Sequence, residues 1–142
     1  MFMLDVKDVG WWYWLASTLC LWTAIAIHPA AFNVALLIGA MQLLHVITTE
    51  RSVTAFPVQV RIGYLCVLLT AVPDGYQWIL WIPAIGTLVR VLTGYCIMAR
   101  NLMLMPFNRR ETLTLDFVKA AYLTAPNKGN MLHGISALRL FN

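Results

Sequence analysis

The residue whose chemistry stands out most in this sequence is Arg90. It lies in the apolar stretch of residues 78–100, whose other cation is the last residue, Arg100. Gly86 and Gly94 lie four residues before and after it, so the three positions fall on one face of a helix. At about 1.5 Å per residue, a continuous helix would put Arg90 roughly 15 Å from Arg100, near the centre of a hydrocarbon layer. An unpaired cation at that depth costs at least about 2.5 kcal/mol, so the sequence predicts an acceptor beside it.

The acidic residues of this chain offer no partner for Arg90 within an apolar stretch. They are Asp5, Asp8, Glu50, Asp74, Glu111 and Asp116. Three kinds of acceptor remain: backbone and hydroxyl oxygens of this chain, a carboxylate on another subunit, or the acidic group of a bound lipid or cofactor. Because glycine lets helices approach closely, we interpret Gly86, Arg90 and Gly94 as a face that binds a partner or a ligand.

A second group of polar residues lies nearer the end of the apolar stretches. Gln42 and His45 are three residues apart and share one side of a helix, and Arg61 and Tyr64 follow on the next stretch at similar depth. A pocket of these residues could hold a quinone headgroup or a haem propionate, and His45 is the candidate metal ligand. A hydrogen-bonded histidine without a chemical role is the alternative.

A bound pigment is a further alternative, because His28 follows Ala24 by four residues, a spacing found in light-harvesting polypeptides that bind (bacterio)chlorophyll. His28 precedes Pro29, however, and the end of a helix is a poor place for a buried ligand.

Motifs of the common enzyme classes are absent from the sequence. It has no P-loop, no dinucleotide-binding glycine pattern, no His-Glu-x-x-His and no Gly-x-Ser-x-Gly. Its three histidines are too few for a self-contained di-iron oxidase, and its three cysteines form no Cys-x-x-Cys pair. We therefore predict no catalytic residues and favour a role that is not enzymatic.

The composition is that of an integral membrane protein. Hydrophobic residues make up 61% of the 142 and charged residues 11%, whereas about a quarter of a soluble domain is charged. Four apolar stretches are long enough to cross a bilayer: 11–27, 30–47, 56–72 and 78–99. We predict an all-α polytopic membrane protein in which four transmembrane helices form a small bundle within residues 1–105.

The basic residues predict the orientation of this bundle. With both termini in the cytoplasm, every Lys and Arg except Arg90 lies inside or at the inner interface, as the positive-inside rule requires. The net charge of +4 is thus spread over loops on one side of a membrane and does not indicate nucleic-acid binding. The aromatic run of residues 11–14 fits the inner interface, or a stacking surface for a flat cofactor or lipid.

Residues 106–142 predict an amphipathic tail on the cytoplasmic surface. A first helix is expected from Thr114, and a second over residues 131–138 after a break at Pro126. The basic residues available to anionic lipid near this surface are Arg109, Arg110, Lys128 and Arg139.

These features together predict a multi-pass protein of the bacterial inner membrane that serves as an accessory subunit of a larger complex. Its partners would be other integral membrane subunits and anionic lipids. The aromatic content and His45 favour an electron-transfer complex, respiratory or photosynthetic. The alternative is a small redox protein that binds quinone or haem through His45, Arg61, Tyr64 and Arg90.

Overall fold

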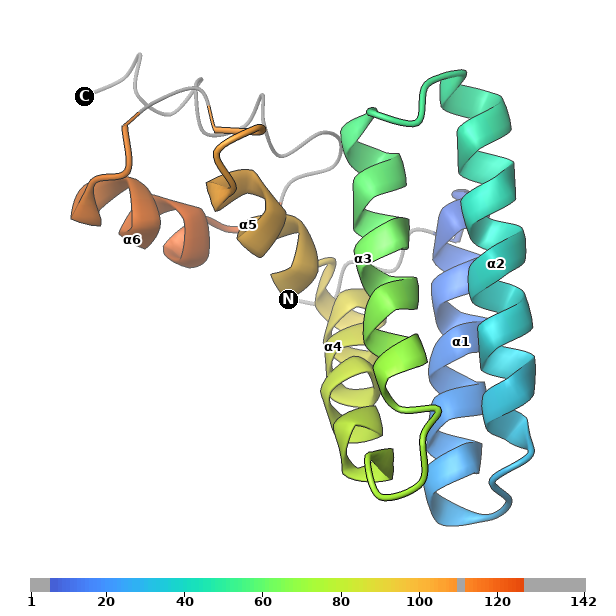
Figure 1. The fold of residues 1–142 in the computed structure, drawn as a ribbon. Helices are drawn as coiled ribbons and strands as arrows, with labels where there is room; N and C mark the ends of the chain where they lie inside the picture. The colour runs from blue at the N-terminus through green and yellow to red at the C-terminus, as the bar shows by residue number, and fades with distance from the viewer. Residues whose placement is uncertain (1–5, 110–111, 127–142) are drawn as a thin grey trace.

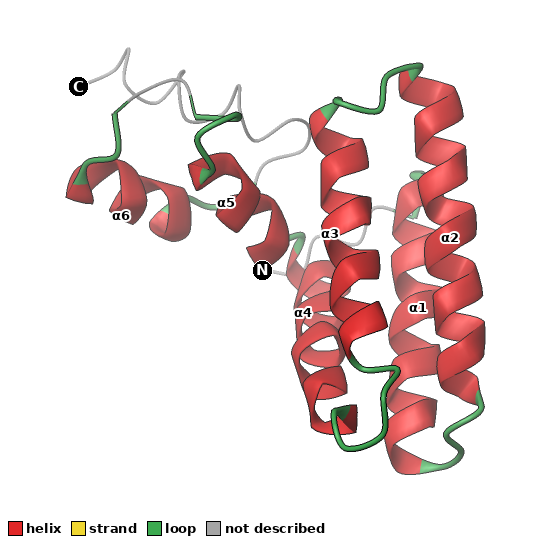
Figure 2. Ribbon diagram, in the orientation of Figure 1, coloured by secondary structure: helices red, strands yellow, loops and turns green. Residues whose placement is uncertain are grey.

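A computed structural model describes residues 6–109 and 112–126 of the chain, and in these residues every regular element is a helix (Figure 2). The elements are α1 (Val9–Ala26), α2 (Ala31–Glu50), α3 (Phe56–Thr70), the 3-10 helix η1 (Gln77–Leu80), α4 (Trp81–Thr93), α5 (Ile97–Leu104) and α6 (Leu115–Leu123). Helices α1 to α4 stand side by side as a bundle, and α5 and α6 extend away from one side of it (Figure 1). The predicted all-α class is confirmed for the described residues.

The first three predicted helices are present, and their ends differ from the predicted ones by at most three residues. Asp8 caps α1 by accepting a hydrogen bond from the backbone N–H of Gly10 at 3.0 Å. The sequence His28-Pro29 separates α1 from α2, because proline disfavours a helical residue before it. Pro57 lies in the first turn of α3, where its missing N–H costs nothing.

The prediction of one continuous helix over residues 78–99 is wrong. Helix α4 ends at Thr93, and α5 begins at Ile97 with its axis turned by 102°. Gly94 makes the break: it adopts the left-handed conformation, with φ 75° and ψ 0°, and its N–H donates to the carbonyl of Arg90. Glycine adopts this conformation without the steric cost that a Cβ would bring, so it ends the helix.

The break also corrects the predicted depth of Arg90. Arg90 lies in the last turn of α4 rather than in the middle of a long helix. The indole Nε1 of Trp11 donates to the carbonyl of Val91 at 3.1 Å, which places the end of α4 beside the start of α1. Arg90 is therefore near the end of the bundle that carries Lys7 and Asp8, and the expected cost of a cation at the centre of a bilayer does not apply.

Small and aromatic side chains fill the centre of the bundle. Ala35, Ala84 and Leu21 are fully buried, and the ring of Trp14 meets that of Tyr64 edge to face at 5.0 Å. Small residues let the helices pack closely, and small residues are also common where helices meet in membranes.

Arg100 holds α6 against α5. Its side chain is fully buried, its Nη1 donates to the carbonyl of Ala121, and its Nη2 donates to that of Thr124 at 2.6 Å. Its guanidinium also lies 3.9 Å from the ring centroid of Tyr95, whose hydroxyl donates to the carbonyl of Tyr122. The carbonyls at the end of α6 thus gain the donors that the helix itself cannot supply. The sequence analysis placed Arg100 among the basic residues at the inner interface and did not predict these contacts.

The amphipathic helix predicted from Thr114 is present as α6, and the Thr114 hydroxyl accepts a hydrogen bond from the N–H of Phe117. The second tail helix predicted over residues 131–138 lies outside the described residues, as do Arg110, Lys128 and Arg139.

By length and composition alone, α2 is the helix able to cross a membrane among the described residues. The bent pair of Gln77–Thr93 and Ile97–Leu104 raises the number to two if it counts as one span, and α3 is a shorter apolar helix. Four separate spans are therefore not established by this criterion.

The two glycines that flank Arg90 give opposite predictions for the same substitution. We expect Gly94→Ala to lower the free energy of unfolding in detergent by about 1 kcal/mol, because a Cβ strains the left-handed conformation. Gly86→Ala should leave it unchanged or raise it by up to about 1 kcal/mol, because no heavy atom lies within 4 Å of a Cβ there and alanine favours helix. Equal effects of the two substitutions in denaturant titrations would contradict the assigned break.

Candidate functional site

The predicted Arg90 site corresponds to a cavity of about 130 Å³ where α1, α3, α4 and α5 meet. We call it the Arg90 cavity. Its walls are Trp14, Tyr64, Val67, Ile82, Pro83, Gly86, Thr87, Arg90, Cys96, Ile97, Met98 and Asn101. They are mostly apolar, and among the described residues Arg90 is the one charged group in the lining.

The flanking glycines have different places in this site. Gly86 lies in the wall of the Arg90 cavity, with open space where its side chain would be, whereas Gly94 forms the break between α4 and α5. The Nη1 of Arg90 donates to the carbonyl of Gly94 at 3.0 Å. A guanidinium has five N–H donors, so this one bond leaves Arg90 the capacity to bind an acceptor in the cavity.

Arg61 approaches the same region from α3. Its Nη1 donates to the carbonyl of Pro57 at 3.0 Å, and its guanidinium carbon lies 5.7 Å from the ring centroid of Trp14. Its buried Nε has no hydrogen-bond partner among the described residues. Arg61 and Tyr64 both contact the ring of Trp14, which shares the lining of the cavity with Arg90.

Gln42 and His45 do not share one environment. Gln42 is fully buried, and neither atom of its amide has a hydrogen-bond partner among the described residues. His45 is exposed, and its ring centroid lies 5.7 Å from that of Tyr13 at the α1–α2 contact. The predicted pocket of Gln42, His45, Arg61 and Tyr64 therefore does not form around His45.

The described residues contain no cluster of three metal-ligating side chains. His28 is exposed in the turn between α1 and α2, where its Nδ1 accepts a hydrogen bond from the N–H of Ala30. The Arg90 cavity is smaller than the roughly 300–1,000 Å³ of pockets that enclose drug-sized ligands. It can take a headgroup or one end of a chain, but not a whole porphyrin.

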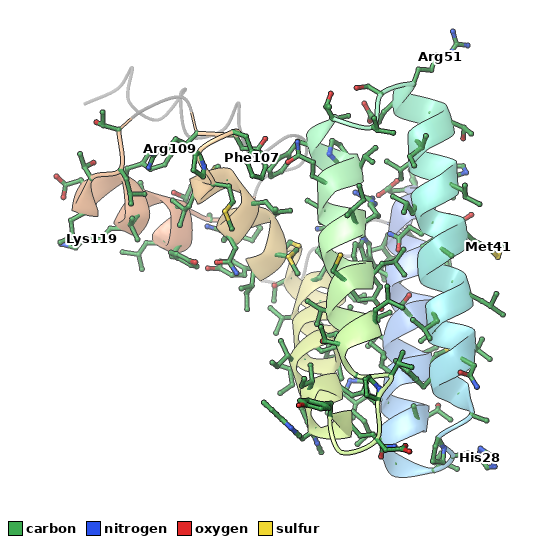
Figure 3. The ribbon with its side chains drawn as sticks, in the orientation of Figure 1. His28, Met41, Arg51, Phe107, Arg109 and Lys119 are labelled. Carbon is green, nitrogen blue, oxygen red and sulfur yellow. The ribbon has the colours of Figure 1, made fainter. Side chains whose placement is uncertain are left out.

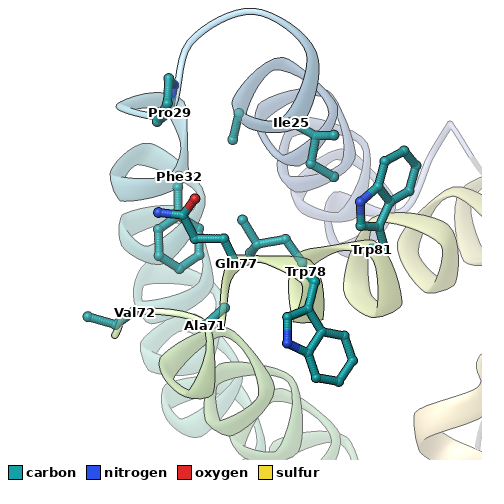
Figure 4. Close-up of a pocket in the computed structure, with 10 residues that line it drawn as sticks. Ile25, Pro29, Phe32, Ala71, Val72, Gln77, Trp78 and Trp81 are labelled. Carbon is teal, nitrogen blue, oxygen red and sulfur yellow. The ribbon is translucent and has the colours of Figure 1, made fainter. Parts of the chain in front are cut away.

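A second pocket, of about 340 Å³, lies at the opposite end of the bundle (Figure 4). Trp78 and Trp81 come from the start of the fourth helical segment, and Pro29 and Phe32 from the start of the second. The sequence analysis missed this pocket, because its walls come from segments far apart in the chain.

No family model, curated protein or solved structure matches the chain. The chemistry that the geometry supports at the Arg90 cavity is binding, because one cation lies among mostly apolar walls. The Thr87 hydroxyl in the lining already donates to the carbonyl of Pro83 at 2.8 Å. Such a lining suits a molecule that is acidic at one end and apolar elsewhere.

The effect of replacing Gln42 on stability tests whether its buried amide lacks hydrogen-bond partners. Replacing Gln42 with Leu should raise the free energy of unfolding in detergent by about 1–3 kcal/mol, because an unpaired buried amide carries that cost. Gln59→Leu is the matched control. Gln59 donates to the carbonyl of Thr54 at 2.8 Å and accepts from Asn108, so its loss should cost about 1 kcal/mol for each hydrogen bond. A clear loss of stability in Gln42→Leu would contradict the unpaired state.

Proposed function

We propose that the chain is an integral protein of the bacterial inner membrane and a non-catalytic subunit of a larger complex. The observation that carries this proposal is the apolar surface of α2. Val34, Leu37, Met41 and Leu44 follow at helical spacing, and all four are exposed. Met41 is seen on the outer side of α2 in Figure 3.

The exposure of α2 argues against a soluble fold. Only 17% of its most apolar window is buried in the bundle, whereas the core helix of a soluble protein is mostly buried. The outer faces of α1, α3 and α4 are apolar as well, with Leu19, Leu69, Ile82 and Ile85 exposed. Contiguous apolar surface of this extent favours contact with lipid or with other subunits.

The ends of the bundle differ in charge in the way that a membrane orientation predicts. Arg51 and His28 mark opposite ends of the bundle (Figure 3). The turns at the His28 end contain Asp74 and no Lys or Arg, and Lys7 precedes α1 at the other end. This asymmetry supports four spans with the Lys7 and Arg51 end in the cytoplasm.

The α5–α6 unit suits the cytoplasmic interface. The axis of α5 is turned by 102° from α4, so α5 would lie along the membrane surface if α4 spans it. Leu115 and Leu123 of α6 are exposed beside the charged Asp116 and Lys119. Such a segment can contact lipid headgroups or a neighbouring subunit.

The electron-transfer role of the complex stays a prediction from the aromatic content and His45. A redox protein that binds quinone or haem gains less support, since His45 is outside the Arg90 cavity and the cavity is small.

The orientation can be tested with single cysteines in a background where Cys20, Cys66 and Cys96 are replaced by alanine. A membrane-impermeant maleimide added to spheroplasts should label Asp74→Cys, and should label Arg51→Cys only after lysis. Both residues are exposed, so burial does not limit either reaction. Labelling of both cysteines in intact spheroplasts, or of Arg51→Cys alone, would contradict the proposed topology.

The subunit role predicts stable association in the membrane. After extraction in a mild detergent, the chain should migrate on native gels with other membrane polypeptides, and mass spectrometry should identify them. Association is expected because the described part of the chain leaves the apolar faces of α2 and α4 uncovered. A homogeneous monomer that co-migrates with no other polypeptide would argue against a subunit.

A further inference from the structure

The Arg90 cavity exists because α3 and α4 do not pack closely against each other. Helix α3 packs mainly on α2, and α4 packs mainly on α1, so few residues of α3 and α4 are in contact. Gly86 adds to the space, because no atom lies within 4 Å of where its Cβ would be. The result is an apolar cleft between two helices, with Arg90 in its wall.

The charge in and around this cleft is positive. Arg90 lines it, and the guanidinium carbon of Arg61 lies 5.7 Å from the ring centroid of Trp14, another residue of the lining. None of the carboxylates in the part of the chain that the structure describes contributes to its lining. Two neighbouring cations in a largely apolar site are stabilised by a bound anion, and a guanidinium binds phosphate or carboxylate oxygens well.

The position of Arg90 along the bundle fits the level of lipid headgroups. It lies in the last turn of α4, and the next residue, Val91, is bonded to Trp11 at the start of α1. Ile82 and Ile85 are exposed on the turns of α4 that lead away from this end. An acyl chain below a headgroup at Arg90 would therefore lie along apolar surface.

We propose that the Arg90 cavity binds the acidic headgroup of an anionic membrane lipid, with the first part of its acyl chain between α3 and α4. This inference rests on the proposed membrane location. A carboxylate on a straight helix of another subunit fits less well. The axis of α5 is turned by 102° from that of α4, and α5 contributes Ile97 and Asn101 to the walls of the cavity. A flexible chain can pass this obstruction, whereas a rigid helix along Gly86 and Arg90 would meet it.

The test measures how phosphatidylglycerol shifts the unfolding temperature of the purified full chain in detergent micelles. Phosphatidylcholine with the same acyl chains is the neutral control. We expect phosphatidylglycerol to stabilise the wild-type protein and phosphatidylcholine to have little effect. Arg90→Gln should weaken the apparent affinity for phosphatidylglycerol about fivefold, because one basic side chain near an anionic lipid surface contributes about that factor to binding.

Two further variants separate the site from general charge and from misfolding. Arg51→Gln removes the same charge at an exposed position outside the cavity, and it should retain the wild-type affinity. Gly86→Leu keeps both arginines and fills the cavity, so it should weaken binding while the chain still folds. An equal loss in Arg51→Gln, or unchanged affinity in both Arg90→Gln and Gly86→Leu, would overturn the proposal.

Separate measurements distinguish a lipid from a small anion, and test the lipid site independently of the proposed membrane location. If inorganic phosphate in phosphatidylcholine micelles reproduces the shift, the site binds small anions and the lipid assignment is wrong. If Arg90→Gln loses its co-migrating polypeptides and keeps its lipid affinity, Arg90 binds a partner's acid instead. A wild-type protein that does not respond to phosphatidylglycerol overturns the lipid site, but leaves the cysteine-labelling test of the membrane location unaffected.

Discussion

The left-handed turn at Gly94 is the constraint on which the arrangement of this chain depends. It ends α4 after Thr93 and turns the chain by 102° before α5 begins. Without it, α4 and α5 would form one rod that continued past the end of α1. With it, residues of α5 cover the Arg90 cavity, and α6 packs on α5 at the side of the bundle.

Side-chain donors satisfy the carbonyl groups that such breaks leave unpaired. Trp11 donates to Val91 at the end of α4, and Arg90 donates to Gly94 within the break. Arg100 does the same for α6, through the carbonyls of Ala121 and Thr124. The last carbonyls of a helix have no partner in the helix, so each of these donors removes the cost of an unpaired carbonyl. The bonds of Trp11 and Arg100 also link two segments of the chain, whereas that of Arg90 is local to the break. These bonds hold α1 to α4 and α5 to α6.

Much of the bundle could be predicted from the sequence, because its helix ends are marked by strong local signals. Pro29 and Pro57 restrict the backbone whatever surrounds them. Gly94 is not such a signal: glycine on a helix face can serve close packing or a left-handed end, and only the contacts of the surrounding chain decide. The role of Arg100 was also hidden, since its acceptors are backbone carbonyls more than twenty residues away in a helix whose position depends on that break.

Arg90 of α4 and Arg100 of α5 show that burial alone does not identify a binding site. Arg100 is completely buried, but two carbonyls and the ring of Tyr95 surround its guanidinium, so it acts within the fold. Arg90 is only half buried, yet among the described residues a single carbonyl bonds it, and it lines a mostly apolar cavity. A cation gains most from an external anion where the chain supplies few acceptors and water has limited access. That condition fits Arg90 better than Arg100, and it is why we propose the less buried of the two arginines as the binding site.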